Sequence, residues 1–287
     1  MMTKILSEAQ IAQYRQDGFL FPFPALSAEE LAECNAGLAR FEEWLGAPVN
    51  QGDFRWRSGS YVFLPWVDAL VRHKRILDAV EDLIGPDILV YTATWFIKEA
   101  NSPAFAAWHQ DATYFGLVPN DQHVTAWVAL SNASAAAGCM EVASSRGRPR
   151  QMRHAALRLA NSINGAGQAI VEPVDQTGTA MMELPAGSFS LHNTLCRHRS
   201  APNRADHRRV GLGISYIPAQ CRLSGSVRMC ARLVRGNDTG GHFDLIPAPE
   251  GELHPAALVR HERVYGRYRD NYEEQVTAHE RQFAAAD

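Results

Sequence analysis

Two histidine–aspartate motifs in the chain combine side chains that bind divalent metals. The first is His109-Gln110-Asp111, and the second is His242-Phe243-Asp244. Side chains two residues apart on a β-strand point to the same face, so the imidazole and the carboxylate of either motif would lie side by side on a strand. Two imidazoles and one carboxylate form the usual ligand set of non-haem iron(II). The motif alone does not choose between the two copies, because the chain contains 11 histidines.

A third ligand and a neighbouring cation distinguish the first motif from the second. An iron site that works with a dicarboxylate cosubstrate needs a distal histidine and a basic residue for the far carboxylate. Arginine suits that role, because its planar guanidinium binds a carboxylate through two hydrogen bonds. His198 is followed by Arg209 eleven residues later, and no other histidine after Asp111 has an arginine at that spacing. We therefore predict His109, Asp111 and His198 as the three ligands, and we interpret the second motif as a surface turn.

The predicted elements place these residues in a β-rich core that follows several helices. One helix begins at Ser7, where Gln10 completes a capping box, a second extends from Ser27 to Gly46, and a third covers 69–83. Segments rich in threonine, valine and aromatic residues then alternate with polar turns, as expected for strands. The predicted strands are 19–23, 88–98, 108–113, 124–130, 168–171, 188–192 and 209–217.

This order of elements predicts a mainly β fold with flanking helices. A jelly roll or open-ended barrel suits it, because such folds enclose small-molecule cavities. We predict a single domain over 1–287, with N-terminal helices at 7–85, a β core at about 88–218 and a C-terminal extension at 219–287. The polar, irregular segment 146–167 is expected to form a long loop near the cavity. The chain from Pro255 onward is charged and helix-prone.

Composition narrows the class of partner. The 287 residues carry a net charge of −3, which gives no reason to expect nucleic acid. No run of about 18 apolar residues occurs, so no membrane span is predicted. The five cysteines are scattered and form no CxxC pair, which favours free thiols in a reducing cytoplasm. A small molecule is the expected partner, and the oligomeric state stays open.

Four groups of residues resemble the phytanoyl-CoA dioxygenase family of iron(II)- and 2-oxoglutarate-dependent oxygenases. They are Trp108-His109-Gln110-Asp111, the segment 125–130 (TAWVAL), Gly138-Cys139-Met140, and the segment 198–203 (HRSAPN) followed by Arg208-Arg209. The resemblance extends from Asp17-Gly18-Phe19 to the strand ending at Tyr216. One loop departs from the family pattern, since the segment 144–148 (SSRGR) replaces the usual Gly-Ser-His turn. That departure weakens analogies about the substrate.

The resemblance implies a cupin-like double-stranded β-helix that uses iron(II), 2-oxoglutarate and O2. It also implies the roles of six residues: His109, Asp111 and His198 as catalytic metal ligands, and Arg209, Ser200 and Trp127 as contacts of 2-oxoglutarate. Members that halogenate lack the carboxylate ligand, so the presence of Asp111 favours hydroxylation of a small organic molecule with release of succinate and CO2. His192 is expected to support a ligand or to lie in the core rather than to bind the metal.

Several alternatives stay open at the level of the sequence. Arg208 could replace Arg209 as the carboxylate anchor, although Arg209 shares its strand face with glycines and Arg208 shares its own with large aliphatic residues. Arg55, Arg57 and Arg146 could bind an anionic substrate, but solvated surface charge is the favoured interpretation. The same cofactors could also give cyclisation, epimerisation, desaturation or epoxidation. The same ligand types could instead belong to a non-catalytic binding barrel or to a zinc hydrolase.

Overall fold

The computed structural model describes residues 3–157, 159–164 and 167–284. Residues 1–2, 158, 165–166 and 285–287, which belong to the predicted domain and partly to the predicted loop 146–167, lie outside the described residues. The helices are α1 (Glu8–Asp17), α2 (Ala28–Leu45), η1 (Phe54–Arg57), η2 (Ser60–Val62), α3 (Pro65–Val71), α4 (Lys74–Ile84), α5 (Ala112–Phe115) and α6 (Pro255–Ala284). None of the helices in these ranges is both long and apolar enough to span a bilayer.

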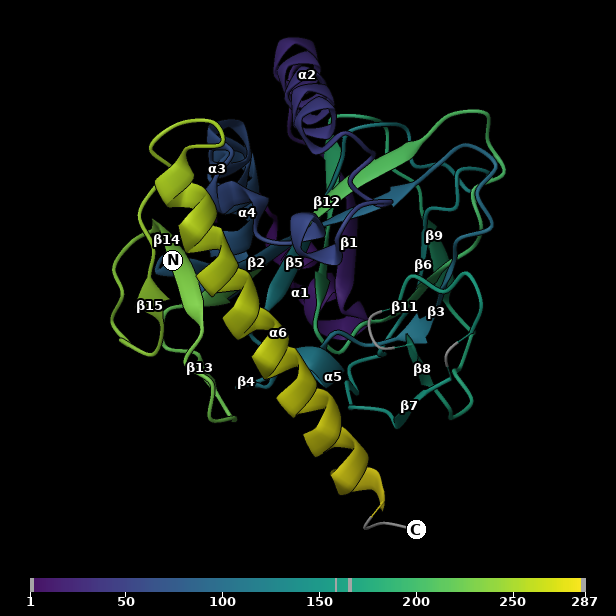
Figure 1. Ribbon diagram of the computed structural model, residues 1–287. Coiled ribbons are helices and arrows are strands. Elements are labelled where there is room, and N and C mark those ends of the chain that lie inside the picture. Colours follow the sequence, from purple (N-terminus) through teal and green to yellow (C-terminus); the bar gives the residue numbers. More distant parts are fainter. Residues whose placement is uncertain (1–2, 158, 165–166, 285–287) are drawn as a thin grey trace.

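The strands form two larger sheets, which we call the major and the minor sheet (Figure 1). The major sheet has the order β1-β10-β5-β12-β2-β14-β15, and the minor sheet has the order β3-β11-β6-β9. Two short pairs, β4 with β13 and β7 with β8, lie outside them, and every pairing is antiparallel except that of β14 with β15. The strands are β1 (Phe19–Pro24), β2 (Ile88–Lys98), β3 (Ala106–His109), β4 (Leu117–Val118), β5 (Val124–Ala129), β6 (Met140–Ala143), β7 (His154–Ala156), β8 (Gln168–Ile170), β9 (Thr179–Met182), β10 (Ser188–Asn193), β11 (Arg197–Ser200), β12 (Arg209–Pro218), β13 (Arg222–Leu223), β14 (Cys230–Arg235) and β15 (Asp244–Leu245).

The predicted starts of the first two helices are confirmed, and the third predicted helix is wrong in its extent. Ser7 and Ser27 each form a capping box with the residue three positions later. The predicted helix 69–83 is instead the end of α3 and most of α4. The break falls at His73, whose φ of −58° and ψ of 126° are not helical. It separates two short helices that both bury an apolar side against the sheet.

Alternation along β12 divides the major sheet into a core face and a cavity face. The side chains that join the same buried cluster as α2, α3 and α4 are Val210, Leu212, Ile214 and Tyr216. The intervening residues Arg209, Gly213 and Ser215 line a cavity on the other face. The sequence predicted this alternation of small and large aliphatic residues, but it did not predict which elements cover either face. The helices therefore fix the sheet, and the opposite face is free to carry chemistry.

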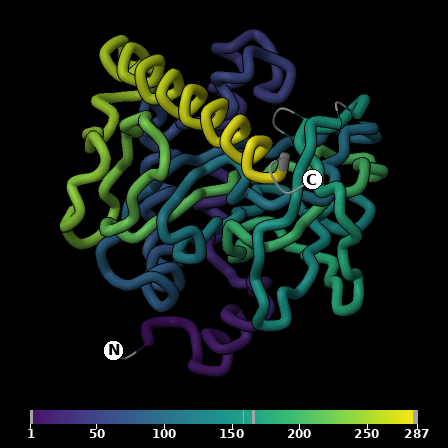
Figure 2. Tube along the Cα trace, turned by 90° about the horizontal axis from the view of Figure 1, so that it is seen from below, coloured from purple at the N-terminus to yellow at the C-terminus, as the bar shows by residue number. Residues whose placement is uncertain are grey.

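Strands and a helix from outside the predicted core 88–218 complete the fold. In the major sheet, β1 pairs with β10 and β14 pairs with β2. The helix expected from Pro255 is confirmed as α6, which runs diagonally across the front of the molecule in Figure 1. Figure 2 shows it along one side of the molecule, with the N-terminus on the opposite side. α6 packs against α5, the short helix that follows the first histidine–aspartate motif.

Candidate active site

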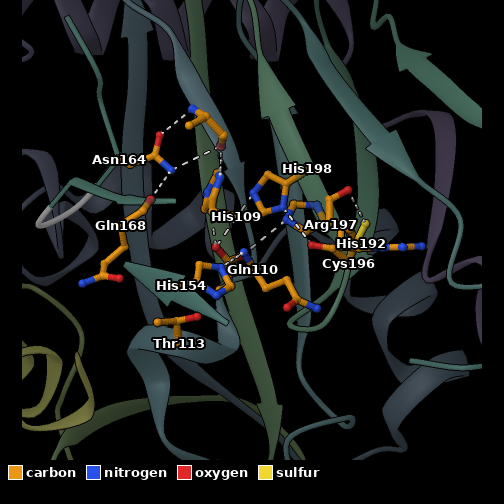
Figure 3. Close-up of polar contacts among 12 residues, drawn as sticks. His109, Gln110, Thr113, His154, Asn164, Gln168, His192, Cys196, Arg197 and His198 are labelled. Atoms are coloured by element: carbon orange, nitrogen blue, oxygen red, sulfur yellow. Dashed lines mark hydrogen bonds and ion pairs between the residues drawn. The ribbon is translucent and has the colours of Figure 1, made fainter. Parts of the chain in front are cut away.

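Two histidines from neighbouring strands of the minor sheet meet at one end of the cavity. His109 ends β3 and is the direct cross-strand partner of His198 in β11, and their ring centroids are 4.0 Å apart (Figure 3). The Nδ1–H of His109 donates to the Ala107 carbonyl at 2.8 Å, and that of His198 donates to the Cys196 carbonyl at 3.0 Å. These bonds fix both ring orientations and leave both Nε2 lone pairs free to bind a metal.

Asp111 reaches the histidines by a route different from the predicted one. Its backbone is helical, with φ −66° and ψ −26°, and it begins α5. The predicted strand 108–113 is therefore wrong beyond His109, because the chain leaves the minor sheet there and Ala112 bonds to the Thr194 carbonyl. The carboxylate nevertheless arrives beside the imidazoles. Its Oδ1 lies 3.9 Å from Nε2 of His109 and 3.9 Å from Nε2 of His198.

Gln110, between the two motif residues, holds this turn in place. It is fully buried, and its amide nitrogen donates to the carbonyls of Leu195 at 2.6 Å and Arg150 at 2.9 Å. The side-chain amide oxygen of Gln110 accepts from the Met152 N–H at 2.7 Å. The backbone N–H of Gln110 donates to Nε2 of His154 at 3.0 Å (Figure 3). One side chain thus ties the motif to the loop at 150–154 and to the turn before β11.

The protonation states of the three groups suit a divalent cation. One donor atom from each of His109, Asp111 and His198 lies within 4.8 Å of the other two. Burial lowers the pKa of His198 to about 3 and also lowers that of His109. Burial would raise the pKa of Asp111, but His192, whose Nε2 is 3.6 Å from Oδ2, and the nearby His198 outweigh it and hold that pKa well below its usual range. Neutral imidazoles and an ionised carboxylate are the forms that metals require.

A buried cation without a carboxylate partner lines the same cavity. Arg209 is 2% exposed, its Nη1 donates to the Gly138 carbonyl at 2.5 Å, and its guanidinium carbon lies 5.4 Å from the Trp127 ring centroid. Within the described part of the chain, no carboxylate forms an ion pair with it, and burial lowers its pKa to about 10. Ser200, two residues after His198, also lines this cavity. An anion would fit beside this guanidinium.

Arg208 faces away from the cavity. It is partly exposed and forms ion pairs with Glu42 at 2.7 Å and with Glu99 at 2.8 Å. Its charge is therefore already compensated, whereas that of Arg209 is not. The geometry accordingly favours Arg209 as the residue that meets a ligand.

The cavity has a volume of about 720 Å³ and includes all six predicted site residues in its wall. Most of the aromatic residues in that wall come from α5 and α6, and these are Tyr114, Phe115, Tyr265, Tyr268 and Tyr272. The three α6 tyrosines were not predicted as site residues, although their spacing of three and four places them on one helix face. Arg57 lines the cavity, whereas Arg55 pairs with Asp53 and Arg146 pairs with Asp175 at the surface.

The second histidine–aspartate motif has a structural role. The carboxylate of Asp244 binds Arg228 at 2.6 Å and Arg267 at 2.5 Å, and His242 is exposed. With its carboxylate taken by two guanidinium groups, this motif is a poor metal site. The exposed His242 agrees with the interpretation of this motif as a surface turn, whereas Asp244 begins the strand β15 and Phe243 is buried.

Comparison with known proteins connects this geometry to one family. A curated relative from Stutzerimonas stutzeri, described as a probable alpha-ketoglutarate-dependent hypophosphite dioxygenase, is 25% identical over 160 residues, which cover 55% of each chain. The chain thus matches about half the length of that relative. The solved structure of apo ThoJ, described as a non-heme monooxygenase, is 31% identical, with a TM-score of 0.80 over 93% of this chain and 99% of ThoJ. CytC3 with Fe(II) and alpha-ketoglutarate shares the fold, with 18% identity and a TM-score of 0.61 over 87% of this chain and 97% of CytC3.

These similarities confirm the predicted jelly-roll fold and the enzyme class predicted from the sequence, the iron(II)- and 2-oxoglutarate-dependent oxygenases. A profile of one family matches residues 14–211, which include the two histidines, Asp111 and Arg209. The chain therefore belongs to the phytanoyl-CoA dioxygenase family.

Proposed function

We propose that the protein oxidises a C–H bond of a small organic molecule to an alcohol, in a reaction that consumes O2 and converts 2-oxoglutarate to succinate and CO2. One observation carries this proposal. A group of two neutral imidazoles and one carboxylate faces the same cavity as a buried guanidinium that has no carboxylate partner among the described residues. A barrel that only held a metal would have no need for such a cation, and a barrel that only bound an anion would have no need for the metal ligands.

His109, Asp111 and His198 would hold iron(II) through Nε2, a carboxylate oxygen and Nε2. The bound iron would supply the activation of O2 that the oxidation of an unactivated C–H bond requires. The chain itself orients the ligands, because the carbonyls of Ala107 and Cys196 fix the two rings and His192 fixes the carboxylate. It also supplies the ligands in their metal-binding protonation states, so that no proton has to be displaced from an imidazole when the metal binds.

Arg209, Ser200 and Trp127 would hold 2-oxoglutarate at its far carboxylate. The guanidinium can donate two parallel hydrogen bonds to a carboxylate, and the Ser200 hydroxyl can donate a third. The indole of Trp127 packs beneath the guanidinium and excludes water from one side of this ion pair. In a water-poor site, each of these bonds contributes more to binding than it would at the surface.

The aromatic wall from α5 and α6 would hold the substrate opposite the metal ligands. Cyclisation, epimerisation, desaturation and epoxidation need the same residues, and the position of the substrate decides among them. Asp111 occupies the position of the third ligand, which disfavours halogenation, and we propose hydroxylation as the default outcome. The cytoplasmic location and the single-domain organisation stay predictions.

The test measures 2-oxoglutarate consumption first and product second. Iron(II)-loaded protein is expected to release succinate from 2-oxoglutarate in air when a substrate library is added. His109→Ala and Asp111→Ala should abolish this release, whereas His242→Ala should retain it. Mass spectrometry of the product then separates addition of oxygen from loss of hydrogen or isomerisation. Activity that needs zinc and no O2, or equal loss in the His242 variant, would refute the proposal.

A further inference from the structure

Lys98 is a second buried basic residue beside Arg209. It ends β2, it is the direct cross-strand partner of Arg209 in β12, and it has no exposed surface. The chain has three lysines, and the other two, Lys4 and Lys74, are exposed. Within residues 3–157, 159–164 and 167–284, no carboxylate forms an ion pair with Lys98. Glu99, the next residue, is taken by Arg208 at 2.8 Å.

The side-chain nitrogen of Lys98 contacts three oxygen atoms. They are the Ser200 hydroxyl at 2.7 Å, the Gly138 carbonyl at 3.4 Å, and the Ala201 carbonyl. The Gly138 carbonyl also accepts from Arg209, so the two basic side chains share one acceptor. Because Lys98 does not line the cavity and Ser200 does, any effect of Lys98 on a ligand would pass through the Ser200 hydroxyl.

The charge state of Lys98 decides which way the Ser200 hydroxyl can donate. A charged ammonium has three hydrogens and would donate to both carbonyls and to Ser200, which leaves the hydroxyl hydrogen free for a ligand. A neutral amine has two hydrogens and one lone pair. Because the carbonyls can only accept, the amine would donate its two hydrogens to them. Its lone pair would then accept a hydrogen bond from the Ser200 hydroxyl. The hydroxyl would then turn its lone pairs toward the cavity, where an anion would be repelled.

The surroundings favour the neutral amine when no anion is present. Burial and the neighbouring Arg209 lower the pKa of Lys98 to about 6, and the Cys139 thiol in the turn before β6 opposes this weakly. From β11, the group that faces Lys98 is the uncharged Ser200 hydroxyl. An anion placed beside Arg209 would favour the charged ammonium in turn.

We infer that Lys98 is a positioning residue for 2-oxoglutarate: it takes up a proton from solvent when the far carboxylate binds beside Arg209, and this turns the Ser200 hydroxyl to donate to that carboxylate. The inference rests on the proposed function, because it takes 2-oxoglutarate as the anion. It goes further in assigning a coupled protonation to a residue outside the cavity wall. No covalent bond changes other than the N–H bond formed at Nζ.

Lysine-selective NMR on the wild-type protein tests this directly. With three lysines labelled at Cε and Nζ, Lys4→Arg and Lys74→Arg assign the exposed signals and leave Lys98. Zinc(II) replaces iron(II) so that the sample stays diamagnetic. At a pH of about 7.5, the Lys98 signal should have the shift of a neutral amine with zinc alone and that of an ammonium after 2-oxoglutarate is added. Titration calorimetry in two buffers of different ionisation enthalpy should report uptake of close to one proton.

The outcomes separate the two proposals. If 2-oxoglutarate binds but the Lys98 signal stays neutral, or if that signal is already charged without it, the coupling is wrong and the proposed function stands. If 2-oxoglutarate does not bind to the zinc-loaded protein, both fall. Lys98→Met should raise the KM for 2-oxoglutarate about tenfold, leave kcat nearly unchanged and remove the proton uptake. Lys74→Met, a change at an exposed lysine, should leave the KM and the proton uptake as they are in the wild type.

Discussion

Substitution of Gly211 by alanine should weaken 2-oxoglutarate binding, although Gly211 is not itself one of the residues proposed to hold the cosubstrate. A Cβ at this position of β12 would lie 1.9 Å from Cζ2, 2.3 Å from Cη2 and 2.5 Å from Cε2 of Trp127. Ordinary contact between carbon atoms needs about 3.5–4.0 Å, so the indole would have to move by about 1.5–2 Å. Trp127 is 3% exposed, and Arg209 lies over its ring, so this movement would displace the support of the carboxylate anchor.

The size of the effect follows from overpacking and misplacement. Forcing an extra methyl group into a filled core costs about 1–3 kcal/mol. For a protein of this size, that lowers the Tm by roughly 2–4 °C for each kcal/mol. A displacement of about 1 Å near a reacting group reduces catalytic efficiency by up to about 100-fold. We therefore expect the KM for 2-oxoglutarate to rise about 10–100-fold in Gly211→Ala, measured from succinate release.

A double variant isolates the cause. Trp127→Phe removes the outer ring that carries the colliding atoms, so Gly211→Ala combined with Trp127→Phe should bind 2-oxoglutarate better than Gly211→Ala alone. If Gly211→Ala keeps the wild-type KM, or if the two changes simply add, then the close approach of Gly211 to the indole is not what fixes the anchor.

Three further predictions concern the carboxylate anchor Arg209, the loss of stability at acid pH, and the turn that Gln110 holds in place. Arg209→Met should raise the KM for 2-oxoglutarate by at least about 30-fold, because removing one partner of a buried charge pair costs about 2–5 kcal/mol; an equal effect of Arg208→Met would contradict this. Burial lowers the pKa of His154 to about 3. In the unfolded chain, His154 binds a proton near pH 6.5. The free energy of unfolding should therefore fall as the pH drops below about 6.5, by about 2 kcal/mol at pH ~5. His154→Gln should make the Tm less dependent on pH between about 7 and 5, and an unchanged pH dependence would argue against this. Gln110→Leu should lower the free energy of unfolding by about 2–4 kcal/mol, because backbone groups lose their partners; a wild-type Tm would show that these bonds contribute little.

The features that could be predicted from the sequence are those decided by neighbouring residues. The capping boxes at Ser7 and Ser27 depend on residues three positions apart, and both helices begin where that pattern predicts. The alternation along β12 depends on a period of two, so Arg209 and Arg208 could be assigned to opposite faces before any contact was known. The structure bears this out, because Arg208 meets Glu42 and Glu99 on the outside of the cavity.

The features that could not be predicted depend on contacts between distant segments. Asp111 was expected on a strand, but its turn is set by buried bonds from Gln110 to the loop at 150–154 and to Leu195, which no local pattern reveals. The tyrosines of α6 face the cavity because α6 packs on α5, and a helical repeat of tyrosines does not say what it packs against. Lys98 gave no signal either, because its position opposite Arg209 depends on the pairing of β2 with β12.

The buried basic groups Lys98 and Arg209 are better explained by binding than by stability. Taking an unpaired charge out of water costs several kcal/mol. Arg209 bears that cost in an interior strand of the major sheet, and Lys98 opposite it avoids the cost by staying neutral until an anion binds. The fold therefore carries an electrostatic cost that an anion at this end of the cavity offsets. A keto acid with one carboxylate would offer the metal the same chelating end but would leave Arg209 uncompensated and Lys98 neutral. The pairing of β2 with β12 places Lys98 opposite Arg209. We therefore expect a preference for a dicarboxylate over a monocarboxylate keto acid, independently of any contact with the metal.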